Sequence, residues 1–176
     1  MRRMSRWFTR SRLVLATAIV VLGLAAYTGN VLATAGTGFT GTTIAKATFG
    51  DLFSFVHDKT PQSWNEIIWT HGNTDMYVQQ NTWQPGGTTG WHTHPGPSFI
   101  VVTQGSLTVY EGNDPTCTPH VYTANTANNS FVDIGGGAVH LVRNETDAVA
   151  QAIAVQLTPA GATRREDAAD PGHCSF

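Results

Sequence analysis

The sequence predicts an all-β domain, built as a sandwich or a small barrel, and three observations favour that class. Only 12% of the 176 residues are charged, well below the usual quarter. Short segments rich in β-branched and aromatic residues recur along the chain, each bounded by Gly, Pro, Asn or Asp. Long runs of the helix-forming residues Glu, Lys and Leu are absent. Many short strands at regular spacing are typical of all-β domains.

The expected strands follow a lead-in at residues 36–41, GTGFTG, which we expect to be flexible. They are residues 42–47, 52–56, 64–69, 76–84, 99–103, 106–110, 120–123, 130–134, 139–143 and 149–157. The segment 64–69 can form a strand or a single helical turn. We expect Pro-Gly-Gly at 85–87 to end one strand and Gln-Gly at 104–105 to close a tight hairpin. The Ala-rich, charged tail from Pro159 has room for one short helix.

The N-terminal residues predict an export signal. Five arginines lie in the first 12 residues, an uncharged apolar segment follows at 13–26, and Ala33-Thr34-Ala35 matches an A-x-A cleavage pattern. The alternative is an uncleaved membrane anchor. Both interpretations place the folded domain outside the cytoplasm, either secreted or anchored. We therefore expect three parts: a signal peptide or anchor at 1–35, a β-barrel at 36–158 and a C-terminal tail at 159–176.

The uneven charge excludes one class of partner. All twelve acidic residues lie at or after Asp51, and only five basic residues follow position 35. The domain after residue 35 therefore carries a net charge of −7 with neutral histidines. A domain of that sign has no electrostatic basis for binding nucleic acid. We expect a small-molecule partner, and contact with a membrane only through an uncleaved anchor.

The chain has two cysteines, Cys117 and Cys174. In an exported protein an even number of cysteines predicts a disulfide, which here would tie the polar C-terminal tail to the loop around residue 117. The alternatives are two free thiols, or a metal site shared with His120 and His173, whose spacing fits no common zinc pattern.

Three histidines form the candidate metal site. His92 and His94 are one residue apart, so on a strand both imidazoles project from the same face and reach one ion. His140 follows three glycines that permit a tight bend. We expect it to meet the first pair across the barrel interior. Three neutral imidazoles bind iron, zinc, manganese, copper or nickel, so we expect one divalent transition metal of unassigned identity.

These stretches resemble the two conserved motifs of the cupin superfamily. Gly86, His92, His94 and Gly105 sit at the spacings of the first motif, G-x5-H-x-H-x3,4-E-x6-G. The second motif, G-x5-P-x-G-x2-H-x3-N, is matched by residues 137, 140 and 144 and departs at Asn129 and Gly135, where the family has Gly and Pro. The resemblance covers about residues 76–157. It implies a jelly-roll β-barrel with a metal inside, and a homodimer is common in the family.

The main departure from the family is Ser98, which stands where the motif has its metal-binding Glu. Without that carboxylate, a divalent ion on three neutral histidines would keep a site charge of about +2 rather than about +1. The site would then attract an anionic or chelating ligand. Ser98 would hydrogen-bond a metal-bound water rather than coordinate the ion.

Three-histidine sites of this kind resemble those of cupin oxygenases, so the resemblance implies a dioxygenase acting on a small anionic or chelating molecule. Two alternatives stay open: a non-enzymatic extracytoplasmic protein that binds a sugar or another small molecule, and a metal-assisted isomerase or lyase.

Six residues are expected to surround the metal or face the ligand: Ser98, Trp91, Tyr77, Gln79, Phe99 and Asn144. Tyr77 and Gln79 alternate on one expected strand, so both would project from one face. For Trp91 the plainer alternative is packing in the core or at the barrel rim.

Overall fold

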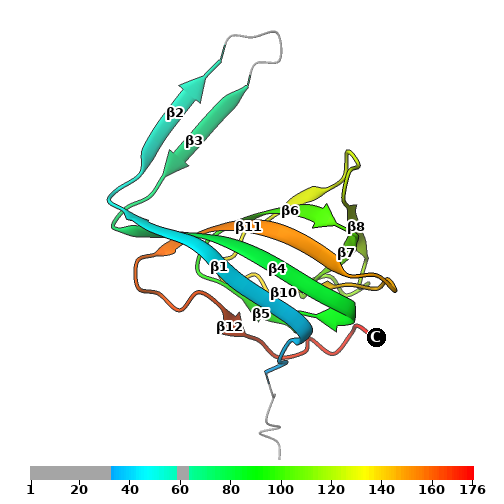
Figure 1. Ribbon diagram of the computed structural model, residues 1–176. Coiled ribbons are helices and arrows are strands. Elements are labelled where there is room, and N and C mark those ends of the chain that lie inside the picture. The colour runs from blue at the N-terminus through cyan, green and yellow to red at the C-terminus, as the bar shows by residue number, and fades with distance from the viewer. Residues whose placement is uncertain (1–32, 59–63) are drawn as a thin grey trace, which may run out of the picture. The chain divides into compact units, whose positions relative to one another are not determined.

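The structure is a computed structural model that describes residues 33–58 and 64–176 (Figure 1). These ranges contain strands and no helix, so the prediction of an all-β domain is confirmed. The strands are β1 (Thr37–Phe49), β2 (Phe53–His57), β3 (Asn65–Trp69), β4 (Thr74–Thr88), β5 (His92–Thr93), β6 (Ser98–Gln104), β7 (Ser106–Glu111), β8 (His120–Thr123), β9 (Ser130–Asp133), β10 (His140–Arg143), β11 (Ala150–Pro159) and β12 (Glu166–Asp167).

Ten of these strands form one antiparallel sheet that curls into a nearly closed barrel (Figure 1). The sheet runs in the order β12-β5-β10-β4-β11-β6-β9. In addition, β1 pairs with β4, β7 pairs with β10, and β8 pairs with β7. Its core consists of alternating inward residues, including Trp83, Val102, Leu107 and Ala152. The predicted barrel is thus confirmed, and its histidine-bearing strands β5 and β10 are direct neighbours.

Three local predictions were wrong. Residues 37–41 are not a flexible lead-in, because they begin β1 and pair with β4. Pro85-Gly86-Gly87 does not end β4, which continues to Thr88 through an irregularity in its pairing with β1. Gly87 permits this continuation, since a Cβ there would lie 2.5 Å from the carbonyl oxygen of Gly38. The tail forms the short strand β12 in place of a helix.

The expected hairpin at Gln104-Gly105 was also wrong. Strand β6 pairs with β9 and β11, whereas β7 pairs with β8 and β10. Gly105 adopts a positive φ of 69°, the backbone conformation that glycine tolerates best. The turn therefore moves the chain from one part of the barrel to another, and it does not join two paired strands.

Strands β2 and β3 form a separate hairpin that extends beyond the barrel strands in Figure 1. Within the segment 64–69, residues 65–69 thus form a strand, one of the two alternatives left open by the sequence. The hairpin exposes large apolar side chains, among them Phe53, Ile67 and Trp69, and Trp69 is 76% exposed.

The predicted signal peptide or anchor at 1–35 lies almost wholly outside the described residues, which begin at Ala33. Within the described ranges, no helix has the length and apolar character needed to cross a membrane.

Candidate metal centre

The three predicted histidines lie together inside the barrel. His92 and His140 are opposite residues of the antiparallel pair β5–β10, and His94 follows β5 directly. The ring centroids of His140 lie 4.1 Å from His92 and 5.1 Å from His94, and all three rings are buried. His140 therefore meets His92 as a cross-strand neighbour, whereas the sequence interpretation had placed it across the barrel interior.

A backbone carbonyl oxygen holds one nitrogen of each ring. The Nδ1 atom of His92 lies 3.0 Å from the carbonyl oxygen of Gly90, and the corresponding atoms of His94 and His140 lie 2.5 Å from Gly96 and 3.3 Å from Ala138. Since a carbonyl oxygen can only accept a hydrogen bond, each Nδ1 carries a proton, and Nε2 is the atom of each ring that faces the other members of the group. Such backbone contacts orient metal-binding histidines.

An acidic residue that the sequence analysis missed completes the group. Asp133 ends β9, and its Oδ2 lies 3.1 Å from Nε2 of His94 and also contacts Nε2 of His140. Strands β6 and β9 place Asp133 directly opposite Ser98, the position where the family motif has Glu. The expectation of a site without a carboxylate was therefore wrong, because a neighbouring strand brings a carboxylate to the same place.

The electrostatics of the site favour the forms that bind cations. Burial on its own would raise the pKa of Asp133, but hydrogen bonds and charge from His140 and His94 lower it below its ordinary value. Burial, together with the charge of His140, lowers the pKa of His92 to about 2. The carboxylate is thus ionised and His92 neutral near neutral pH, and these are the forms that coordinate metals.

These side chains fit a divalent transition metal. The ligand atoms of His94, Asp133 and His140 all lie within 4.8 Å of one another, and Nε2 of His92 lies 3.1 Å from Nε2 of His140. Metal binding at such a group replaces the protons that link its members. Two histidines and one carboxylate are the ligand set of non-haem iron(II) oxygenases. The position of His92 allows it to add a further nitrogen.

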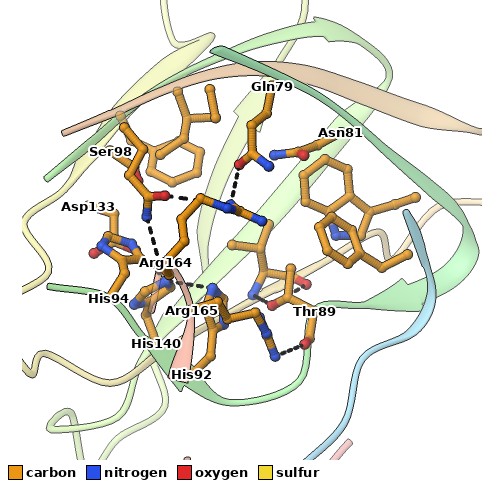
Figure 2. A pocket seen from close by; sticks show the side chains of 17 residues that line it. Gln79, Asn81, Thr89, His92, His94, Ser98, Asp133, His140, Arg164 and Arg165 are labelled. Atoms are coloured by element: carbon orange, nitrogen blue, oxygen red, sulfur yellow. Dashed lines mark hydrogen bonds and ion pairs between the residues drawn. The ribbon is translucent and has the colours of Figure 1, made fainter. Parts of the chain in front are cut away.

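The group lines one end of a cavity of about 70 Å³, drawn in Figure 2. Ser98 from β6 and Gln79 from β4 also line it, as predicted. Arg164 and Arg165 enter from the C-terminal segment, and no pattern in the sequence had pointed to them. Figure 2 shows the Arg164 side chain crossing the cavity toward Gln79, with the histidines and Asp133 grouped together.

Two predicted ligand-facing aromatic residues lie elsewhere. Phe99 follows Ser98 on a strand whose side chains alternate, so it points outward and is 46% exposed. Tyr77 shares its face of β4 with Gln79 but lies beyond the cavity lining. Its hydroxyl donates to Asp75 at 3.3 Å and its ring lies 5.8 Å from the guanidinium of Arg164. It therefore contacts the arginine rather than the cavity.

Trp91 and Asn144 have structural positions. Trp91 is 1% exposed and packs with Tyr110 and Leu141, which confirms the plainer alternative of core packing. Asn144 is fully buried, and its Nδ2 donates to the carbonyl oxygens of Gln84 and Ala148. These bonds join the loop that follows β10 to strand β4. The expected role next to the ligand was therefore wrong for both residues.

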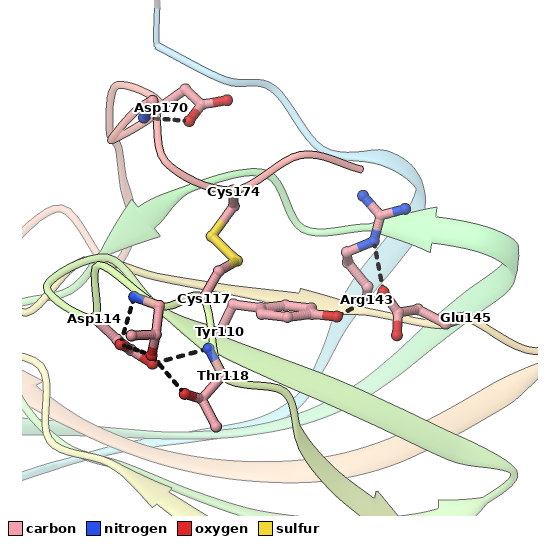
Figure 3. The surroundings of a disulfide bond; sticks show 10 residues. Tyr110, Asp114, Cys117, Thr118, Arg143, Glu145, Asp170 and Cys174 are labelled. Carbon is pink, nitrogen blue, oxygen red and sulfur yellow. Dashed lines mark hydrogen bonds and ion pairs between the residues drawn. A yellow bond between two sulfur atoms is a disulfide. The ribbon is translucent and has the colours of Figure 1, made fainter.

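The predicted disulfide between Cys117 and Cys174 is formed, with the two Cα atoms 5.5 Å apart (Figure 3). It joins the loop after β7 to the C-terminal tail. The last residue, Phe176, adds to this attachment, since its ring lies 4.7 Å from that of Tyr110 and 4.2 Å from the guanidinium of Arg143. The tail is thus fixed at its end by a covalent bond and earlier by the pairing of β12 with β5.

No protein-family model matches the sequence, and no curated protein matches it. Among solved structures, the chain is similar to a cupin-like protein from Thermotoga maritima, with 20% identity over 54% of this chain and 65% of that one and a TM-score of 0.43. It is similar to a conserved protein with a double-stranded β-helix domain from Klebsiella pneumoniae, with 17% identity over 68% of this chain and 80% of that one and a TM-score of 0.43. It is also similar to an oxalate oxidase, with 22% identity over 48% of this chain and a TM-score of 0.39, and it spans 46% of that protein's length.

Proposed function

We propose that this chain, which has a cupin-like β-barrel, is an exported metal-dependent oxygenase that acts on a small anionic molecule. The observation that carries the proposal is the convergence of His92, His94, His140 and Asp133 at one end of a cavity. A neutral His92 and an ionised Asp133 are the forms in which imidazole and carboxylate bind a metal.

Iron(II) is the metal that this ligand set favours, because two histidines with one carboxylate typify non-haem iron oxygenases. When bound, such an ion supplies coordination positions for a chelating molecule and for dioxygen. The chain's own residues set the charge of the site and the orientation of the ligands. Asp133 brings the charge of the site to about +1 rather than the +2 expected without a carboxylate. The backbone carbonyls of Gly90, Gly96 and Ala138 hold the three rings in orientation.

Export is supported by the disulfide, since such bonds persist in oxidising compartments. The Arg-rich and apolar N-terminal residues would direct that export as a cleaved signal, or would hold the barrel at the membrane as an uncleaved anchor. Either form leaves the metal centre facing the extracytoplasmic space.

The test is the metal content of the purified protein combined with dioxygen uptake. We expect about one iron per chain, and dioxygen consumption when small mono- and dicarboxylates are added. Bound metal without uptake for any of these acids would overturn the oxygenase and favour the non-enzymatic binding protein. A metal content no higher than that of a protein without the histidine cluster would overturn both the oxygenase and the metal-assisted isomerase or lyase.

Moving the carboxylate between strands tests the role of Asp133. Asp133→Asn is expected to weaken metal affinity by about 100-fold, because a neutral amide replaces the one anionic ligand. Adding Ser98→Glu to that variant should recover part of the loss, since the two positions face each other across β6 and β9. The affinity is measured by competition with a chromophoric chelator.

The matched control for this series is Asp147→Asn, which removes an exposed carboxylate outside the cavity. It should leave metal affinity unchanged. Equal affinities for the wild-type protein and Asp133→Asn would show that Asp133 is not a ligand.

A further inference from the structure

The C-terminal segment places one arginine inside the cavity without an anionic partner. Arg164 lies two residues before β12, and its Nη1 donates to the side-chain oxygen of Gln79 at 2.5 Å and to that of Gln156 at 3.5 Å. Both acceptors are neutral amides. Across residues 33–58 and 64–176, no carboxylate lies within ion-pair distance of Arg164.

The neighbouring Arg165 is held differently. Its Nη2 lies 2.6 Å from Oδ1 of Asp167 and donates to the carbonyl oxygen of Thr89 at 2.7 Å. Its charge is therefore compensated within the tail. Burial lowers the pKa of Arg164, yet a guanidinium stays charged at neutral pH. A partly buried cation whose protein partners are neutral favours an anion beside it.

We propose that Arg164 is the specificity residue that binds the carboxylate group of a small ligand, and this inference rests on the proposed metal site at the other end of the same cavity. A planar guanidinium matches a carboxylate through two parallel hydrogen bonds, so it selects that group over a neutral one of equal size.

A further donor supports the same class of ligand. Trp83 lines the cavity and is 3% exposed, and its indole Nε1 has no hydrogen-bond partner in the described part of the chain. A buried N–H of this kind is costly unless an acceptor reaches it, and carboxylate oxygens are acceptors only. The cavity of about 70 Å³ is far smaller than pockets for drug-sized molecules, so the ligand has only a few non-hydrogen atoms.

The experiment compares acetate with acetamide, which match in size and differ in charge. Binding is measured by calorimetry or ligand-observed NMR on zinc-loaded and on metal-free protein. Acetate should bind more tightly than acetamide. Arg164→Gln should weaken acetate binding about 10- to 100-fold and leave acetamide unaffected. Arg164→Lys keeps the charge without the planar fork, so its affinity for acetate should lie between those of the wild-type protein and Arg164→Gln.

Lys46→Gln is the matched control, because it removes one positive charge at a residue of β1 that lies outside the cavity. It should leave acetate affinity unchanged. Equal binding of acetate by the wild-type protein and by folded Arg164→Gln would overturn the inference, as would equal affinity for acetate and acetamide. If metal is bound but the affinity for acetate does not depend on Arg164, only this inference fails. If acetate depends on Arg164 but no metal binds, only the proposed function fails.

Discussion

Replacing His140 by alanine is expected to abolish tight metal binding, with a loss of more than about 100-fold in affinity, beyond the 10- to 100-fold typical of changes next to a ligand. His140 is the central member of the group, because its Nε2 lies 3.1 Å from Nε2 of His92 and also contacts Asp133. Removing its ring would leave the other ligands facing a gap. Metal content after gel filtration, followed by chelator competition, measures the effect.

His120→Ala is the control for this variant, since His120 is an exposed residue of β8 and does not line the cavity. Thermal unfolding separates ligand loss from misfolding. A metal that binds the folded protein raises its melting temperature, so chelator should lower that temperature in the wild-type protein and in His120→Ala. His140→Ala should melt at the same temperature with and without chelator. Unchanged metal content in folded His140→Ala would rule out this centre.

The histidines could be predicted from the sequence because each lies in a local pattern, an H-x-H pair and a histidine after three glycines. Asp133 could not be predicted in the same way. The family motif has its carboxylate on the strand that follows His94, whereas the structure supplies it from β9, opposite Ser98. Finding it required the register between two strands that are distant in sequence.

The alternation of side chains along β6 determines which of two predicted residues faces the cavity. Ser98 and Phe99 are adjacent on one strand, so only one of them can face the cavity. Ser98 does, and Phe99 points outward. This conflict was visible in the sequence. The positions of Arg164 and Arg165 could not be predicted from the sequence. They depend on the path of an irregular tail, which returns to the barrel through the pairing of β12 with β5.

Removing the disulfide, with both Cys117 and Cys174 replaced by serine, is expected to lower the free energy of unfolding by about 4 kcal/mol, the loop-closure value for a bond with a sequence separation of 57 residues. Urea unfolding of the oxidised wild-type protein and of the double variant measures the difference. Reductant should destabilise the wild-type protein and have no effect on the variant. Equal stability of the two proteins would contradict the expectation.

The same variant should separate the two ends of the cavity. The histidines and Asp133 lie on or next to barrel strands, whereas Arg164 belongs to the tail that the disulfide attaches at Cys174. Under conditions where the variant stays folded, a loosened tail should weaken acetate binding and leave metal affinity close to that of the wild-type protein. Because metal affinity and acetate affinity are measured separately, loss of both would show that the tail supports the metal centre itself. Loss of acetate binding alone would show that the bond serves chiefly to hold Arg164 in the cavity.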